Sequence, residues 1–346
     1  MKIKSKLICT LLILGVMGIQ SIFASGNKLG TAAAPELLIP MGAKNVAMAG
    51  ANIADVSKTD AIYWNPAGVA NIENTEASFT YLNYFADMNL SYFALAVSIS
   101  DVSAVGISIQ SFDVGNIDVT TIDNPEGTGE QIQPDYITLG VTYSRRFTDK
   151  ISFGINNKLI SETIGEMSAT AFAWDFGIQY KSDAGIDFGI TLKNIGTELQ
   201  FSGTGTEFNS SIPFANPNAT TRKTNLDLAS AELPTTFNIG AAYKLNIDEV
   251  QDVKIVGQFT NSSFALDHIT GGLEYDYRNL LFVRGGYSMA LFEDNYPSGL
   301  DESEFGLHAG FGINLDIGGN KIFIDYAYRP METFGSTNYF TVGFEL

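Results

Sequence analysis

The sequence predicts an all-β protein: a transmembrane antiparallel β-barrel of about 14 strands with an N-terminal hatch segment in its lumen. Three observations support this prediction. From residue 76 onward, segments of about ten residues alternate between apolar and polar side chains, and tilted strands of that length cross a bilayer. No uncharged apolar run long enough for a spanning helix follows the N-terminus. Long and short connections between the segments alternate along most of the chain.

Residues 1–25 are typical of a secretory signal peptide. Three lysines (Lys2, Lys4 and Lys6) precede an apolar run over residues 7–19, which is short for a membrane span. A short N-terminal anchor is the alternative. Cys9, the single cysteine, lies inside this segment. The exported chain is therefore expected to have no disulfide, thiolate metal site or cysteine nucleophile.

Residues 26–75 differ in character from the rest of the chain. They are rich in Ala, Gly and Asn and show no strand alternation. Residues 45–54 could form a short helix, and the run Asn65-Pro66-Ala67-Gly68 indicates a tight turn. The segment is too apolar for a free tail, so we expect it to form a hatch inside the barrel. Inward-facing Gly306, Gly310 and Gly312 would allow close approach, although relief of crowding within the wall explains them equally well.

Residues 76–346 form the predicted barrel. In residues 172–180, for example, Phe172, Trp174 and Ile178 share one face, and Ala173, Asp175 and Gln179 share the other. The fourteen predicted strands are 76–85, 89–99, 102–112, 135–147, 150–161, 169–180, 185–195, 234–245, 251–262, 268–277, 280–289, 304–315, 320–329 and 338–346. Bacterial barrels have short periplasmic turns and longer external loops. The short connections lie on the side of both chain ends, so both termini are predicted to be periplasmic.

The composition agrees with a wall that faces lipid. Apolar residues make up 45% of the chain and charged residues only 17%, whereas about 25% charged residues is typical of soluble proteins. A soluble β-sandwich is the alternative, but it would not produce the alternation in loop length. Aromatic residues near strand ends are predicted to form the interfacial girdles, namely Tyr81, Tyr84, Phe85, Tyr92, Phe93, Tyr143, Phe147 and Phe153. A net charge of −18 argues against nucleic acid as a partner.

Polar side chains of both signs are predicted to face the lumen. They are Asp175, Asp187, Lys193, Lys244, Arg284, His308, Asp325 and Arg329. A mixed interior suits a hatch held by ion pairs and hydrogen bonds better than the single-sign ring of an ion-selective pore.

No motif for catalysis or cofactor binding is present in the sequence. His268 and His308 lie on separate predicted strands, without metal-ligand spacing. His308 could serve nucleophilic catalysis, but a lumen-facing polar histidine is the simpler interpretation. Four loop carboxylates (Asp294, Asp301, Glu302 and Glu304) could hold calcium, although their irregular spacing favours a solvated surface. We therefore predict a non-enzymatic protein that has no cofactor and no metal site.

One N-terminal stretch carries a family resemblance. Residues 41–51, Asp55 and residues 60–70, with the core Tyr63-Trp64-Asn65-Pro66-Ala67-Gly68, resemble the signature of the PorV/PorQ family. That family is similar to the FadL-type long-chain fatty acid transporters. The resemblance implies a fourteen-strand barrel with a hatch, in which Tyr63, Trp64, Asn65, Pro66 and Gly68 shape and pack the hatch turn. The last strand departs from many outer-membrane barrels, because it ends in Phe344-Glu345-Leu346 and not in an aromatic residue.

The resemblance leaves three functions open for an outer-membrane protein surrounded by lipid. A type IX secretion component would bind the C-terminal domains of secreted cargo, and other secretion components, through loops 113–134, 196–233 and 290–303. A FadL-like transporter would take up a hydrophobic small molecule through a shift of the hatch and release it sideways through the wall. A structural scaffold would do neither.

Overall fold

The structure is a computed structural model that describes residues 28–210, 222–291, 306–331 and 335–346. The predicted signal peptide lies outside these residues, as do the four loop carboxylates considered for calcium. Within the described part of the chain, no helix is long and apolar enough to cross a membrane.

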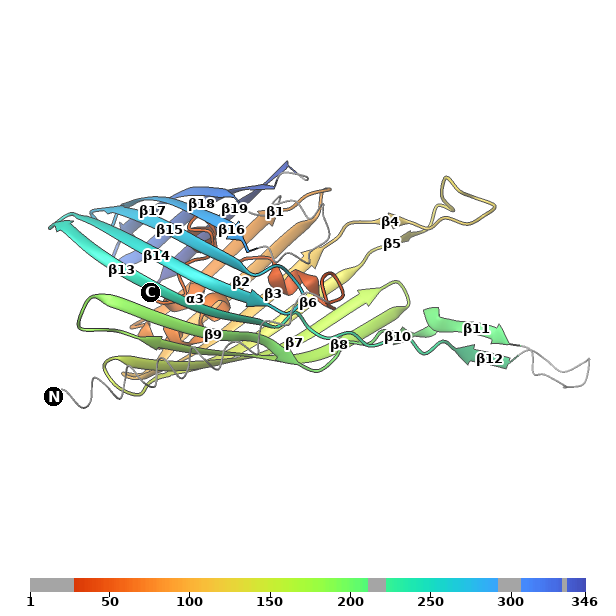
Figure 1. Ribbon diagram of the computed structural model, residues 1–346. Helices are drawn as coiled ribbons and strands as arrows, with labels where there is room; N and C mark the ends of the chain where they lie inside the picture. Colours follow the sequence, from red (N-terminus) through yellow and green to blue (C-terminus); the bar gives the residue numbers. More distant parts are fainter. Residues whose placement is uncertain (1–27, 211–221, 292–305, 332–334) are drawn as a thin grey trace, which may run out of the picture.

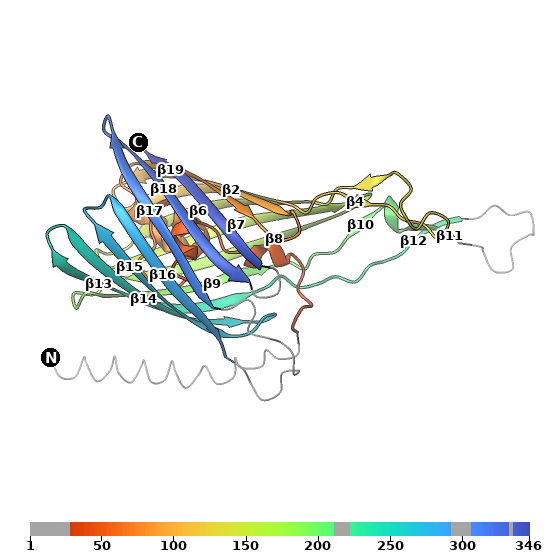
Figure 2. The same ribbon diagram turned by 90° about the horizontal axis from the view of Figure 1, so that it is seen from above.

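The chain forms a closed antiparallel barrel of fourteen strands, as predicted (Figures 1 and 2). Each strand pairs with the next one along the chain, and β1 pairs with β19 to close the ring, for example at Thr80 and Thr341. The strands are β1 (Thr75–Asn83), β2 (Asn89–Ser100), β3 (Ser103–Asp113), β6 (Asp135–Arg146), β7 (Ile151–Ile164), β8 (Met167–Tyr180), β9 (Ile186–Gly196), β13 (Thr236–Asp248), β14 (Gln251–Ser262), β15 (His268–Tyr277), β16 (Leu281–Ala290), β17 (Leu307–Ile317), β18 (Asn320–Met331) and β19 (Gly335–Glu345). Closure pairs the edge strands, so no open sheet edge faces the bilayer.

Alternation along the strands separates two environments. Large apolar side chains, such as Phe79, Val141 and Phe172, are exposed on the outside. Their neighbours in sequence, such as Thr80, Thr142 and Ala171, are buried on the inside. This arrangement presents apolar groups to lipid and polar or small groups to the lumen.

The two ends of the barrel differ. At one end, here called the short-turn end, the connections are 101–102, 147–150, 181–185, 249–250, 278–280 and 318–319. At the other, the long-loop end, connections 114–134 and 197–235 carry short strands that extend beyond the barrel (Figures 1 and 2). The short strands are β4 (Ile117–Asp118) with β5 (Gln131–Ile132), β10 (Ser202–Gly203), and β11 (Glu207–Ser210) with β12 (Arg222–Asn225); the 3-10 helix η4 (Thr204–Thr206) lies between β10 and β11.

One connection is shorter than predicted. The strands β7 and β8 extend toward each other until Ile164 pairs with Met167, which leaves the two-residue turn 165–166. Gly165 adopts a left-handed φ of 57°, which a tight hairpin turn requires. The alternation in loop length is therefore weaker than the sequence suggested.

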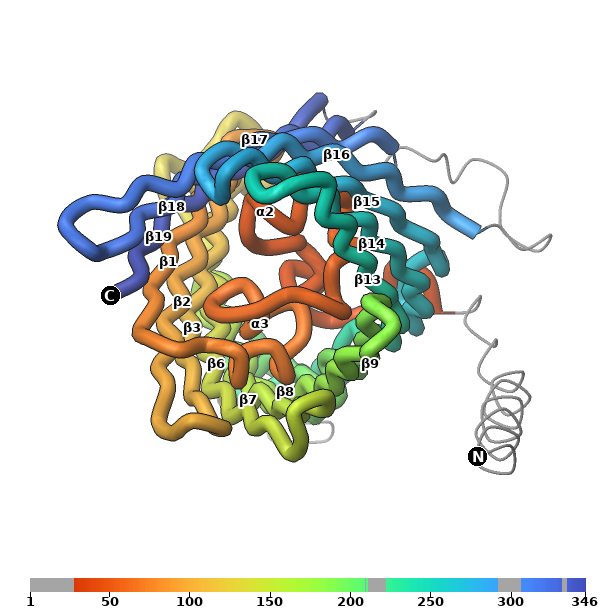
Figure 3. The backbone as a smooth tube through the Cα atoms, turned by 90° about the vertical axis from the view of Figure 1, so that its left-hand side faces the viewer, coloured from red at the N-terminus to blue at the C-terminus, as the bar shows by residue number. Residues whose placement is uncertain are grey.

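The residues before β1 lie inside the ring of strands (Figure 3). They form η2 (Pro35–Leu38), α2 (Ala43–Val46), α3 (Lys58–Trp64) and η3 (Pro66–Asn71), and we call residues 28–74 the hatch. The helix expected over 45–54 is wrong: α2 ends early because Ala49 and Gly50 take left-handed φ angles of 54° and 74°. The buried apolar core of the molecule lies where the hatch packs against the inner wall.

The prediction that both termini are periplasmic stays a prediction, because the N-terminus lies outside the described residues. Leu346 donates a backbone hydrogen bond to Thr75, at the short-turn end. The first described residues lie at the opposite end, where Gly30 donates to Phe264 in the connection 263–267 and Ala33 donates to Glu232. The count of strands placed the start of β1 at the correct end of the barrel. The hatch precedes β1 and runs through the lumen, so the first described residues lie at the other end.

The girdle prediction is wrong at Tyr92. This side chain is buried, faces the lumen and meets Tyr63 edge to face, with ring centroids 6.4 Å apart. Tyr84 also packs against the hatch core. Because side chains alternate along β2, only Phe93 of the pair Tyr92 and Phe93 can face lipid, and it does.

Candidate functional site

The hatch motif forms a hydrogen-bonded turn. Asn65 is fully buried; its side chain accepts a hydrogen bond from Ala67 N (3.2 Å) and donates to Ile53 O (2.8 Å) and Ile178 O (3.2 Å). It thereby caps η3, and Pro66 occupies the first position, where no N–H is needed. A Cβ on Gly68 would lie 2.0 Å from Val56 O, so only glycine fits there.

The two aromatic residues of the motif hold hatch residues 39–41 by hydrogen bonds. Trp64 Nε1 donates to Met41 O at 2.7 Å, and Tyr63 Oη donates to Ile39 O at 2.9 Å. The two rings meet edge to face, with centroids 5.1 Å apart. Burial raises the pKa of the Tyr63 hydroxyl, so the hydroxyl stays a donor.

Glycines of the inner wall bring the strands against the hatch backbone. A Cβ on Gly154 would lie 2.2 Å from the Pro66 carbonyl carbon, and one on Gly189 would lie 2.5 Å from Ile53 O. Of the three glycines expected to have this role, Gly310 abuts Ala47 of the hatch. Gly312 instead makes room for the Asp325 carboxylate, and no atom of the described residues lies within 4 Å of a Cβ placed on Gly306.

Ion pairs fasten the hatch to the wall at the short-turn end. Lys58 Nζ lies 3.2 Å from Glu76 of β1 and 2.7 Å from Glu345 of β19, so it bridges the two strands that close the barrel. Burial lowers the pKa of Lys58, but the two carboxylates outweigh this effect and raise it. Asp55 pairs with Lys254 of β14 at 2.6 Å. Burial raises the pKa of Asp60 on α3 to about 7.

A cluster of buried charged side chains joins strands β15, β16 and β18 of the inner wall. Arg284 of β16 contacts Glu274 of β15 at 2.6 Å and Asp325 of β18 at 2.5 Å. Lys254 lies 3.4 Å from Glu274 and links this cluster to Asp55 of the hatch. Two predicted lumen residues, Arg284 and Asp325, therefore belong to one network.

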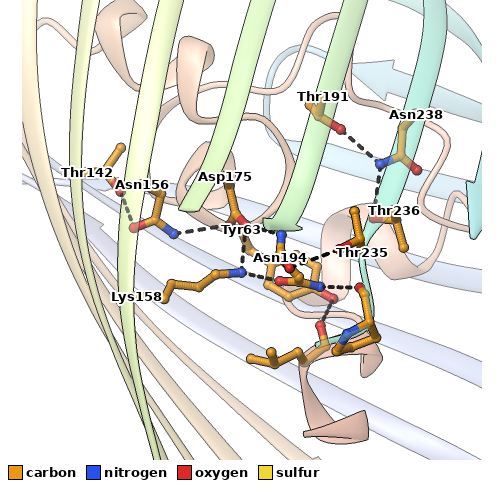
Figure 4. A network of polar contacts seen from close by, with 12 residues as sticks. Tyr63, Thr142, Asn156, Lys158, Asp175, Thr191, Asn194, Thr235, Thr236 and Asn238 are labelled. Carbon is orange, nitrogen blue, oxygen red and sulfur yellow. Dashed lines mark hydrogen bonds and ion pairs between the residues drawn. The ribbon is translucent and has the colours of Figure 1, made fainter. Parts of the chain in front are cut away.

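A second network surrounds Asp175 on β8 (Figure 4). Asp175 pairs with Lys158 Nζ at 2.7 Å and accepts a hydrogen bond from Asn194 N at 2.8 Å. Lys158 also donates to the Asn194 side chain, which in turn donates to Pro234 O at 3.0 Å. The network ties the wall to the base of the connection 197–235.

The remaining predicted lumen residues are dispersed. His308 Nδ1 lies 2.9 Å from Val46 O, and Arg329 lies near the long-loop end of β18. Lys244 is half exposed beyond the hatch and pairs with Asp252 at 2.8 Å. Asp187 accepts a hydrogen bond from Ser182 N near the short-turn end. In the described residues, no group of three or more His, Cys, Asp or Glu side chains could hold a metal ion.

A cavity of about 210 Å³ lies between the hatch and the inner wall, in the half of the lumen nearest the long loops. The hatch contributes an apolar side that includes Leu37, Leu38 and Trp64. Strands β9 and β13–β18 contribute a polar side, with Lys193, Asn194, Thr236, Asn238, Gln258, Thr260, Ser262, His268, Ser288, His308 and Arg329. Sequence patterns did not predict this grouping, because its members come from seven strands and the hatch.

Several important residues were missed by the sequence reasoning. Glu274 and Lys254 alternate in phase with lumen-facing neighbours, so strand periodicity could have found them. Glu36 of η2 is buried against Glu162 of β7, and the sequence contains no signal for that contact.

A family model of the type IX secretion system protein PorV matches residues 23–262. The chain belongs to the PorV family. The match covers the hatch motif and the strands up to β14, which confirms the resemblance drawn from residues 41–70. No curated protein is similar enough in sequence to serve as a relative.

Solved structures confirm the fold of this PorV-family chain. The Pseudomonas putida toluene transporter TodX is 14% identical, with a TM-score of 0.54 over 88% of this chain and 97% of its own. The monoaromatic hydrocarbon channel CymD is 11% identical, with a TM-score of 0.56 over 89% and 97%. A Pseudomonas aeruginosa FadL homologue is 12% identical, with a TM-score of 0.52 over 88% and 97%. At these identities the likeness shows the fold alone: an outer-membrane β-barrel of FadL type.

Proposed function

We propose that this protein is a non-catalytic component of type IX secretion that binds secreted cargo through its long-loop end. One observation carries the proposal. Connections 114–134 and 197–235 form two-stranded ribbons that extend beyond the barrel and expose large apolar side chains. Ile122 is fully exposed, and Ile117, Phe208 and Leu226 are about half exposed. Exposed apolar side chains of this kind are typical of protein-binding surfaces.

The closed lumen supports binding and not passage of cargo. The hatch is held by the Asn65 hydrogen bonds, by Lys58 and Asp55, and by close contact with wall glycines. A folded protein cannot traverse a barrel filled in this way. Cargo would therefore be held outside the barrel, on the ribbons, and handed on to other secretion components in the lipid bilayer.

Deletion of the β4–β5 ribbon tests this function. Residues 118–130 would be replaced by a Gly-Ser turn, and retention of a cargo C-terminal domain by the purified protein would be measured. The matched control replaces the 249–250 turn at the short-turn end. We expect at least a tenfold loss of cargo affinity for the ribbon deletion only. Equal retention by both variants contradicts the proposal.

Uptake of a hydrophobic small molecule is the second candidate, and the apolar hatch side of the cavity favours it. Such a ligand would enter between the outer loops and leave sideways through the wall. Mass spectrometry of an organic extract of the purified protein tests this candidate: a stoichiometric hydrophobic compound supports uptake. Failure of both tests would leave a structural scaffold.

A further inference from the structure

The charge of the cavity is opposite in sign to that of the protein. The chain carries a net charge of −18, yet none of the described residues that line the cavity is acidic. The lining includes Lys193, Arg329 and two histidines. Lysine and arginine side chains in a lumen site whose described lining has no carboxylate attract anions, because Coulomb interactions are stronger where protein replaces water.

Lys193 supplies the central cation. The residue is only 8% exposed, and its Nζ lies 3.7 Å from the centre of the Tyr63 ring and 5.8 Å from that of Trp64. Both rings line the cavity. Among the described residues, no carboxylate oxygen lies within ion-pair distance of Lys193 Nζ, because the neighbouring Asp175 is already held by Lys158 and Asn194 N. A buried ammonium group without an anion is costly, and a bound anion would remove that cost.

A β-bulge turns Asn194 into the cavity beside Lys193, which faces the lumen by regular alternation. Strand pairing between β8 and β9 shifts register around Asp175, and Asn194 adopts a left-handed φ of 60°. In a regular strand, consecutive side chains point to opposite faces. Here Lys193 and Asn194 are both buried and both line the cavity. Bulges commonly re-aim side chains at functional positions.

A second buried group also lacks a partner. Gln258 Nε2 donates to Asn238 Oδ1 (3.2 Å) and to Thr260 Oγ1 (2.9 Å), but its Oε1 has no hydrogen-bond partner in the described residues. Gln258 lines the same cavity. A buried acceptor is normally satisfied, so the polar wall has unused capacity for a ligand or water hydrogen-bond donor.

The volume limits the size of the ligand. A cavity of about 150 Å³ accepts benzene, so in proportion 210 Å³ accepts a molecule of about eight or nine non-hydrogen atoms. A long-chain fatty acid is about twice as large and does not fit within this cavity.

We propose that the cavity binds a small organic anion, with the carboxylate at Lys193 Nζ and the apolar body against Leu37, Leu38 and Trp64. The hydroxyl and amide N–H groups of the polar wall are the donors available to the carboxylate, whereas Gln258 Oε1, an acceptor, requires a water or a donor group on the ligand. The site does not depend on cargo binding, since its residues lie in the lumen and not on the ribbons.

Binding is tested on the full mature protein in detergent micelles, with benzoate as the anion and benzamide as a neutral molecule of the same size. Isothermal titration should show saturable benzoate binding that is at least tenfold tighter than benzamide binding. This comparison needs no variant. Equal affinities, or no benzoate binding up to about 10 mM, overturn the proposal.

Two sets of variants locate the site. Lys193→Met should weaken benzoate binding at least tenfold and leave benzamide unchanged, whereas the control Lys244→Met should change neither. The sequence has two tryptophans, and Trp174 faces outward, so Trp174→Phe leaves Trp64 as the only tryptophan, which is excited selectively over the tyrosines at the red edge of the absorption band. Benzoate should then change the Trp64 fluorescence with the same affinity as in the titration. Saturable benzoate binding that leaves the Trp64 fluorescence unchanged overturns the assignment of the site to this cavity. A benzoate affinity that Lys193→Met does not change overturns it as well.

Discussion

The buried pair of Glu36 and Glu162 predicts that docking of the hatch segment η2 depends on pH. Both residues are about 95% or more buried, and no donor from another described residue reaches either carboxyl oxygen of Glu36. Burial, and then the charge of Glu162, raise the pKa of Glu36 from 4.5 to about 8. A proton on Glu36 allows the two carboxyl groups to share a hydrogen bond, so the docked segment retains that proton at neutral pH.

The size and sign of the effect follow from the pKa difference. When η2 leaves the wall, Glu36 regains a pKa near 4.5, a change of 3.5 units. Each unit corresponds to about 1.36 kcal/mol, which gives an upper bound of about 5 kcal/mol. The free energy of docking is fully present below pH 4.5. It falls as the pH rises toward 8, because the undocked carboxyl ionises first. Above pH 8, Glu36 is ionised in both the docked and the undocked segment, so the free energy of docking no longer depends on pH.

Hydrogen exchange measured by mass spectrometry tests this reasoning. Protection of the peptide that spans residues 34–41, corrected for intrinsic exchange, should fall in the wild type between pH 5 and pH 8. In Glu36→Gln it should stay constant and exceed the wild-type value at pH 8, since the amide remains neutral and can donate to Glu162. Glu126→Gln, at an exposed loop position, is the control and should behave as wild type. A flat wild-type profile, or lower protection in Glu36→Gln at pH 8, refutes the argument.

Three further predictions concern the attachment of the hatch and the wall. Arg284→Met leaves Asp325 buried without its cation and Glu274 with Lys254 alone, so the free energy of unfolding measured in urea should fall by about 3–5 kcal/mol; an unchanged midpoint contradicts this. Gly154→Leu forces the η3 backbone away from β7 and should raise hydrogen exchange in residues 66–71. The control is Gly257→Leu. Gly257 points to lipid and has free space around it, so hydrogen exchange in residues 66–71 should not rise. Lys58→Ala removes a half-exposed bridge between β1 and β19 and should lower stability by about 1 kcal/mol, an effect that shrinks in high salt.

The sequence predicted the barrel well because the strands obey a local rule. Lipid outside and polar groups inside impose a period of two, and each of the fourteen strands was found within a few residues of its true ends. The rule failed where tertiary contacts override it. At the β9 bulge, Asn194 turns to the lumen beside Lys193, against the alternation. Tyr92 obeys the rule: Phe93 takes the lipid side, so Tyr92 faces the hatch.

The candidate site was harder to predict than the fold. Arg284 and Asp325 were expected in the lumen, but their joint contact with Glu274 depends on the register of three strands. Lys58 meets Glu345 across nearly the whole length of the chain. Such contacts arise from closure of the barrel and have no signature in local sequence. The cavity likewise forms only where hatch residues such as Leu37 and Trp64 face side chains from seven strands of the closed barrel.

The arrangement of the hatch contacts bears on the choice between cargo binding and uptake. In the short-turn half, the hatch is held by the Lys58 bridge, by the pair of Asp55 and Lys254, and by hydrogen bonds from Gln179 to Ile53 O and Val56 O. A straight route through the barrel requires all of these to break together, and each buried donor left unpaired costs about 1–3 kcal/mol. Docking of cargo on the outer ribbons requires none of them to move. The hatch closes the short-turn half of the lumen, and the exposed apolar ribbons lie at the long-loop end. This arrangement therefore favours binding at the long-loop end over conduction of molecules along the barrel axis.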